Sequence, residues 1–203
     1  MQALDTAEQI NFSPLLRRYT LEEFWALPEP EDRSHYDLIG GHLFMVPPPN
    51  PPHGSIDARL NKLLIKFLLD NQIDGEVHHP KEPIYRRAQG GTYLEPDMMY
   101  ISDELRESMG DKRTSADIVF EYLSKSTRVY DRTTKADTYL ALGVRELWLV
   151  DPDTISIEVR HAASRADQPV WEIFRYSSGD SAASRVLKGW QFSVDEMFEG
   201  LAI

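Results

Sequence analysis

Cysteine is absent from the 203-residue chain. The sequence therefore excludes a disulfide framework and any metal site built on thiolates, and a reducing cytoplasm is the default compartment. Long apolar runs are absent too, since no window approaches the roughly 18 residues of a membrane-spanning helix. The N-terminus contains Asp5 and Glu8 and has no basic flank before an apolar run, which does not fit a secretory signal. We expect a cytoplasmic protein without a membrane segment.

Positive charge is also scarce. Lysine and arginine number 22 against 33 aspartates and glutamates, which gives a net charge of −11. Binding to nucleic acid by bulk attraction draws on positive charge, so this balance argues against a plain DNA-binding module. It argues less against an enzyme in which divalent cations bridge carboxylates to phosphate.

The apolar content is sufficient for a sizeable core, because 41% of the residues are hydrophobic and the chain has four Trp, eight Phe and nine Tyr. The length fits one domain with a modest extension. We expect a loosely attached N-terminal arm at residues 1–18 and a single domain at residues 19–203.

Local patterns predict a series of short elements. Thr20 and Glu23 form a capping-box pattern that opens a helix at 21–27. Gly40-Gly41 joins strands 35–39 and 42–46 as a hairpin. Apolar residues at helical spacing predict an amphipathic helix at about 55–71. Further elements are expected as strands at 76–79, 83–86, 94–101, 117–123, 145–150, 155–161 and 170–176, and as helices within 103–114, at 130–142 and after Ser193, with a Ser-rich loop at 177–186.

This order of elements predicts the fold class. The strand, helix and strand across residues 117–150 form a crossover unit, which is right-handed if its strands are parallel. The terminal strands alternate well enough to extend the sheet in an antiparallel direction. We therefore expect an α/β or α+β fold with a mixed central sheet flanked by helices.

Two carboxylates stand within predicted strands. Asp97 follows Pro96 in the middle of 94–101, and Glu121 lies near the end of 117–123. Ionised carboxylates are costly inside a sheet unless they are paired, hydrogen-bonded or bound to a cation. On neighbouring strands they favour a hard metal ion, in the first place magnesium. Lys135 on the next helix can reach the same strand ends, where it would stabilise charge on phosphate oxygens. The competing interpretation is a solvated face for each carboxylate.

His53, Tyr139 and Trp148 each have two interpretations. His53 precedes the long helix and either contacts a metal-bound water or phosphate, or hydrogen-bonds a nearby carbonyl as an N-terminal helix residue. Tyr139 and Trp148 are expected in the core rather than as platforms for stacked bases.

A basic face is predicted on the helix at 130–142. Arg128, Arg132 and Lys135 lie at spacings of four and three residues, which suits contact with phosphate. Alternatively, the arginines form a solvated face paired with Asp131 and Glu146.

Several of these segments together resemble a known family. They are Tyr36-Asp37 and the hairpin after it, the prolines of 47–52 with His53, Pro96-Asp97, the segment 117–127, Asp131-Arg132 with Lys135, and the segment 143–152. The combination is similar to the Uma-type restriction endonucleases, a branch of the PD-(D/E)-x-K nuclease superfamily that is abundant in cyanobacteria. The likeness covers roughly residues 19–161.

The resemblance implies a restriction-endonuclease-like core, Mg²⁺ (or Mn²⁺) held by Asp97 and Glu121, and DNA as the substrate. The superfamily's lysine normally stands two residues after the second acidic residue, where this chain has Leu123. The resemblance therefore places the lysine on the following helix, as Lys135. Lys125 competes for that role at a position where the family usually has proline. Asp37 stands where the family commonly has a glutamate, so it is a candidate supporting ligand. His53 and Arg132 are further candidate supporting residues.

Three hypotheses about function follow, ranked by how well the sequence supports them. The first is a magnesium-dependent endonuclease that hydrolyses DNA phosphodiester bonds with water as the nucleophile. The second is a nuclease-fold module without catalysis that binds nucleic acid or protein, which the missing Glu-x-Lys spacing favours. The third is an acidic assembly protein whose terminal strands pair between copies. Such pairing also predicts a homodimer.

Overall fold

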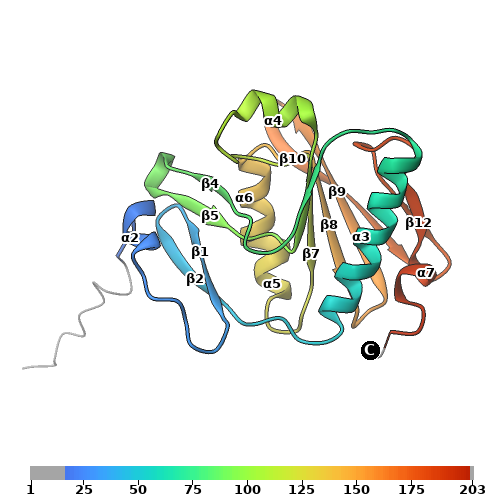
Figure 1. Cartoon of the computed structure of the whole chain (residues 1–203), viewed down its shortest axis with the longest axis horizontal. Helices are drawn as coiled ribbons and strands as arrows, with labels where there is room; N and C mark the ends of the chain where they lie inside the picture. Colours follow the sequence, from blue (N-terminus) through green and yellow to red (C-terminus); the bar gives the residue numbers. More distant parts are fainter. Residues whose placement is uncertain (1–16, 202–203) are drawn as a thin grey trace, which may run out of the picture.

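The computed structural model describes residues 17–201 and contains a six-stranded sheet, a four-stranded sheet and a two-stranded sheet, with the four-stranded sheet lying to one side of the large one (Figure 1). Nearly all of the predicted arm at 1–18 lies outside the described residues. Within the described part of the chain, no helix is both long and apolar enough to cross a membrane.

The larger sheet has six strands in the order β10-β9-β8-β7-β6-β3. The pair β7–β8 is parallel and the other pairs are antiparallel, which confirms the predicted mixed central sheet. In chain order the strands are β3 (Glu76–His78), β6 (Met98–Ile101), β7 (Ile118–Tyr122), β8 (Glu146–Asp151), β9 (Ser156–Arg165) and β10 (Gln168–Ser177).

The connection from β7 to its parallel neighbour β8 is helical. It runs through α5 (Arg128–Tyr130), the π-helical turn η2 (Asp131–Lys135) and α6 (Ala136–Ala141), and then ends near Gly143. Gly143 has φ +86°, a left-handed conformation that favours glycine at the end of a helix. The predicted crossover unit is therefore confirmed.

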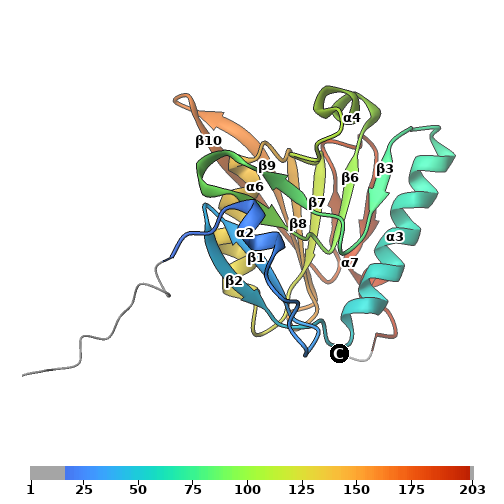
Figure 2. The same ribbon diagram turned by 60° about the vertical axis from the view of Figure 1, so that its left-hand side comes forward.

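The six-stranded sheet separates two cores. One contains Leu60 of α3 (His53–Asp70) and Phe120 of β7. The other contains Tyr139 of α6 and Val119 of β7. Neighbouring residues of a strand point to opposite faces, so α3 and α6 cover opposite faces of this sheet (Figure 2).

The smaller sheet, in the order β2-β1-β5-β4, carries the N-terminal part of the fold. Its strands are β1 (His35–Ile39), β2 (His42–Val46), β4 (Ile84–Arg86) and β5 (Thr92–Leu94). The β1–β2 hairpin has the predicted bounds, and both glycines of its turn have positive φ, as a two-residue hairpin turn requires. The helix α2 (Leu21–Trp25) precedes β1 and has the predicted capping box at Thr20 and Glu23.

One predicted strand is wrong in an informative way. The run 94–101 does not form a single strand, because β5 ends at Leu94 in the small sheet and β6 begins at Met98 in the large one. Pro96 has no backbone N–H to donate to a ladder, so the chain leaves one sheet and enters the other around it. Asp97 therefore lies at a crossover between two sheets.

The C-terminal segment also differs from expectation. The Ser-rich stretch 177–186 contains β11 (Ser181–Ala183), which pairs with β12 (Gln191–Ser193) before α7 (Val194–Phe198). Buried Glu146 ties this segment to the large sheet, because its Oε2 accepts the backbone N–H of Arg185 at 2.8 Å and its Oε1 accepts the indole N–H of Trp148 at 2.6 Å. The remaining short helices are α4 (Asp103–Met109) and the 3-10 turn η1 (Ala88–Gly90).

Candidate active site

Asp97 and Glu121 face the same side of the six-stranded sheet. In the β6–β7 ladder, Met98 lies opposite Phe120. Continuing this antiparallel register by one residue places Asp97 opposite Glu121. Because side chains alternate along a strand, both carboxylates share the face of Val119, which α6 covers.

The side chain of Lys135 reaches the same face of the sheet from the helical connection between β7 and β8. It is the last residue of η2, and its side chain is only 3% exposed. Its Nζ lies 2.8 Å from Glu121 Oε1. The crossover connection thus returns the ammonium group to the strand that the chain has just left, and the π-helical turn that carries it is a feature often found at functional sites.

Glu121 is held by two donors. Besides Lys135, the hydroxyl of Tyr139 on α6 donates to Oε1 at 2.5 Å. Burial raises the pKa of Glu121 well above its usual range, the charges of Asp97 and Asp131 act in the same direction, and Lys135 opposes them. Lys135 therefore offsets only part of the cost of burying this carboxylate.

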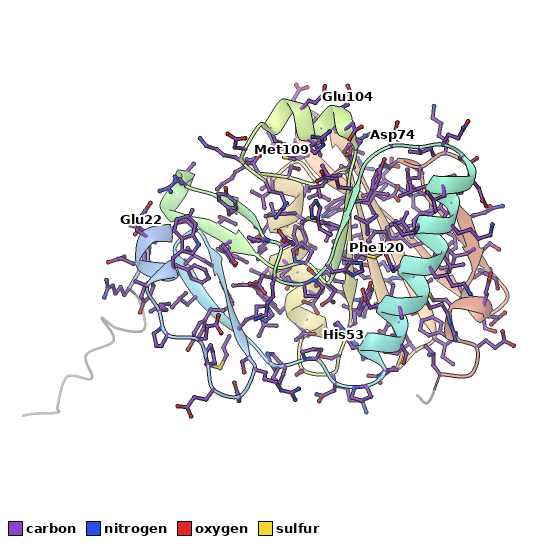
Figure 3. The ribbon with its side chains drawn as sticks, in the orientation of Figure 1. Glu22, His53, Asp74, Glu104, Met109 and Phe120 are labelled. Carbon is purple, nitrogen blue, oxygen red and sulfur yellow. The ribbon has the colours of Figure 1, made fainter. Side chains whose placement is uncertain are left out.

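Asp97 is fixed by both of its oxygens. Oδ2 accepts the backbone N–H of Tyr122 at 2.7 Å, and Oδ1 lies 2.9 Å from His53 Nε2. His53 stands in the first turn of α3 (Figure 3), with its ring edge against the ring of Tyr122. Burial lowers the pKa of His53, but the hydrogen bond and the charge of Asp97 outweigh burial and leave the pKa above its usual value.

Two more buried carboxylates surround the lysine. Asp37 Oδ2 and Asp131 Oδ1 each lie 3.9 Å from Lys135 Nζ. The hydroxyl of Tyr130 donates to Asp37 at 3.0 Å. Burial lowers the pKa of Lys135, but its three carboxylate neighbours outweigh burial and raise it, so the ammonium stays charged at neutral pH.

These groups open into a cleft of about 890 Å³. Its walls come from α2 and the loop after it, the proline-rich segment 46–53, the turn 124–127 and the crossover between β5 and β6. His53, Asp97, Glu121, Asp131 and Lys135 all line the cleft, and Asp37 lies fully buried behind them.

Comparison with known proteins identifies the family. A model of the Uma2 family, described as "Putative restriction endonuclease", matches residues 21–195. The chain belongs to the Uma2 family. The matched range contains every side chain of the cluster described above.

One solved structure similar to this Uma2-family chain is a "putative nuclease belonging to DUF820" from Anabaena variabilis, at 20% sequence identity. The match has a TM-score of 0.67 and covers 88% of this chain and 97% of the other. At this identity the likeness establishes a shared fold, and it confirms the predicted class of a mixed sheet flanked by helices. No curated protein matches the chain.

The donor set of the Uma2-family site suits a hard divalent cation. Four buried or half-buried carboxylates, those of Asp37, Asp97, Glu121 and Asp131, surround the single ammonium of Lys135, so negative charge is in excess. Magnesium prefers oxygen ligands and needs only one or two protein carboxylates beside water and phosphate. Among residues 17–201, no group of three or more His, Asp or Glu side chains is close enough to form a metal cage. Asp97 and Glu121 could supply the one or two carboxylates that magnesium needs.

Five of the six predicted site residues meet in this cluster, and Arg132 does not. Its Nη2 lies 3.3 Å from Asp151 Oδ2 and its Nε 4.0 Å from Glu158 Oε2, and it does not line the cleft. The predicted pairing of Arg132 with Asp131 and Glu146 is therefore wrong, because the helix side that carries Arg132 lies over β8 and β9. Contact between Arg132 and phosphate stays a prediction.

Sequence reasoning missed two members of the site. Asp131 was considered only as an ion-pair partner, and Tyr139 only as a core residue. Tyr139 is indeed fully buried, but its hydroxyl also holds Glu121. The available signal was spacing, because positions 131, 135 and 139 are four residues apart and share one helix face.

Proposed function

We propose that this protein is a magnesium-dependent endonuclease that hydrolyses phosphodiester bonds of DNA, with Mn²⁺ as a possible substitute metal. The observation that carries the proposal is the buried Lys135–Glu121 pair at 2.8 Å, which opens into the cleft that Asp97 also lines. Family membership supports the same activity.

The residues divide into three roles. Asp97 and Glu121 would hold the metal, which when bound would polarise a phosphate oxygen and favour ionisation of a water molecule. Lys135 places a permanent positive charge where negative charge develops on the phosphate, in a site largely screened from water. His53 and the backbone of Tyr122 fix the orientation of the Asp97 carboxylate.

The test is Asp97→Asn, which keeps the size of the side chain and an oxygen acceptor for the Tyr122 N–H. Plasmid cleavage in magnesium buffer should fall below detection, EDTA should stop the wild-type enzyme, and Mg²⁺ or Mn²⁺ should restore it. Asp57→Asn is the matched control, because Asp57 bonds the Tyr122 hydroxyl at 3.0 Å but does not line the cleft. Wild-type cleavage rates in a folded Asp97→Asn protein would remove the assignment.

A second candidate function is binding without catalysis. Leu123 occupies the usual lysine position, and the net charge is −11. Titration calorimetry separates the two: a folded sample that binds neither Mg²⁺ nor Mn²⁺ in the millimolar range would favour an inactive nuclease-fold module.

We further propose that the protein is a cytoplasmic homodimer. The absence of cysteine fits a reducing compartment. Among residues 17–201, no strand pairs with the outer edge of β10 in the large sheet, and Ile173 and Phe174 on β10 are 48% and 37% exposed. Such an edge can pair with a second copy. Light scattering after size exclusion would report a monomer if this is wrong.

A further inference from the structure

One wall of the cleft is aromatic. Phe24 and Trp25 of α2, Tyr36 of β1 and Tyr93 of β5 all line it. Phe24 packs against Tyr93 with ring centroids 4.7 Å apart, and Trp25 meets the edge of Tyr85 at 6.2 Å. Trp25 nevertheless remains 48% exposed. The Arg87 guanidinium also lies over the Trp25 ring, 5.4 Å from its centroid. Aromatic rings that line a cleft suit the stacking of planar ligands.

This wall continues into the catalytic cluster. The hydroxyl of Tyr93 donates to Glu95 at 3.1 Å, and Glu95 stands two residues before Asp97. Both Glu95 and Asp97 line the cleft. A base resting on the aromatic wall would therefore lie in the same cleft as the carboxylates that are proposed to hold the metal.

Three cationic side chains of the cleft have no ion-pair partner within residues 17–201: Arg33, Lys81 and Lys125. Arg33 and Lys81 also have positive φ, +67° and +76°, a backbone region that favours glycine or asparagine. A long cationic side chain at such a position costs stability, and this cost is typical of residues kept for function.

The rest of the cleft disfavours an intact duplex. Glu29, Glu31 and Asp153 also line it, and the whole chain carries a net charge of −11. A duplex would bring two rows of phosphates against these carboxylates. The volume of about 890 Å³ lies within the range of roughly 300–1,000 Å³ that small ligands occupy. A few unpaired nucleotides fit these charges and this space.

We propose that the cleft binds unpaired DNA, with bases stacked on the wall that includes Trp25 and phosphates contacting Arg33, Lys81 and Lys125. This inference rests on the proposed nuclease function and names its substrate: single strands, or duplexes with an unpaired segment. Stacking on aromatic rings beside a groove of separate cations is the general mode of single-strand binding.

Binding is measured with the Asp97→Asn protein in magnesium buffer, using a labelled single-stranded 12-mer and its duplex. The single strand should bind more tightly. Trp25→Ala should weaken this binding about tenfold, as the loss of one stacking ring does, and Trp25→Phe should restore most of it. Leu69→Ala is the matched control, because Leu69 is an apolar side chain of α3 that is 73% exposed and lies outside the cleft.

The cations are tested by Arg33→Gly with Lys81→Gly, which removes two charges and relieves two positive-φ positions. Three phosphate contacts predict a salt slope of about −2 for a single strand, and the double variant should have a slope of about −0.7. Its melting temperature should not fall. Gln72→Gly, at φ +53° outside the cleft, controls for the backbone change, and Lys188→Gln controls for the charge.

Cleavage separates this inference from the proposed function. Preferred cutting of single strands or unpaired segments by the wild-type enzyme supports both. Equal cutting of duplex and single strand, with Trp25→Ala unchanged, overturns the inference and leaves the nuclease function standing. Tight single-strand binding that needs Trp25, without cleavage of any DNA, supports the inference and overturns the nuclease function.

Discussion

Replacing Lys135 with methionine removes one charge of a buried pair and nearly preserves the length of the side chain. Both partners, Lys135 and Glu121, are 3% exposed. The variant therefore leaves a carboxylate inside the protein without the cation that holds it. Glu121→Gln in the same chain removes that charge as well and keeps an oxygen that can accept the Tyr139 hydroxyl.

The magnitude follows from the geometry. Two charges 2.8 Å apart attract by roughly 6 kcal/mol at an effective dielectric constant of about 20. The desolvation of both charges offsets much of this attraction, so removal of one partner should lower the free energy of unfolding by about 3–5 kcal/mol. The double variant should recover about 2–3 kcal/mol of that loss, because the carboxylate nearest the lost ammonium no longer carries a charge. Recovery should stay incomplete, since Asp37 and Asp131 still lack their cation neighbour.

The assay is urea unfolding followed by tryptophan fluorescence at pH 7 in EDTA, with plasmid cleavage measured separately in Mg²⁺. Lys66→Met is the matched control: Lys66 pairs with Asp70 on the exposed side of α3, and its loss should change stability little. Lys135→Met and the double variant should both be inactive.

Two results would refute the reasoning. If Lys135→Met is as stable as the wild type, the ammonium does not occupy the buried pair. If the double variant is no more stable than Lys135→Met, the loss does not come from an orphaned carboxylate at Glu121 but from packing or from Asp37 and Asp131.

Three further predictions concern stability and support of the site. Burial raises the pKa of Glu146, but its contacts with His161, Trp148 and neighbouring groups outweigh burial and lower the pKa. The contribution of Glu146 to the free energy of unfolding is therefore complete above about pH 4.5 and is lost as the pH falls further. Glu146→Gln should be less stable than the wild type at pH 7, and its urea midpoint should fall less steeply on acidification. Gly75→Ala should destabilise by more than about 2 kcal/mol, since the new Cβ would lie 2.7 Å from Tyr100, whereas Gly110→Ala meets open space and should cost about 1 kcal/mol in thermal melts. Tyr139→Phe should lower stability by about 1–2 kcal/mol and reduce cleavage, because Glu121 loses a donor; unchanged cleavage would mean that the hydroxyl only supports the core.

The sequence allowed the convergence of Glu121 and Lys135 to be predicted, because each belongs to an element with a clear period or boundary. Asp97 was also placed beside them, although the single strand predicted around it does not form. The crossover from β7 to β8 was readable from one buried strand, one helix and a stop at Gly143. The hairpin bounds followed from its glycine pair.

Other features depend on contacts that no local pattern encodes. Nothing in 94–101 tells which sheet each half joins, although Pro96 marks where a single ladder must break. The orientation of Arg132 depends on how its helix crosses β8 and β9, which decides that Asp151 is its partner. Tyr139 combines a core position with a polar contact, and apolar periodicity reveals only the first.

The charge distribution explains how an acidic chain can act on a polyanion. Arg128, Arg132 and Lys135 are paired with carboxylates, so they contribute little long-range attraction. What remains is local: the ammonium of Lys135, a divalent cation held by the carboxylates, and a few unpaired cations in the cleft. Such a surface repels DNA at a distance and attracts a phosphate only inside the cleft, where screening by salt is weakest. Cleavage should therefore depend steeply on divalent metal and only shallowly on monovalent salt, the reverse of a protein that binds DNA through a basic face.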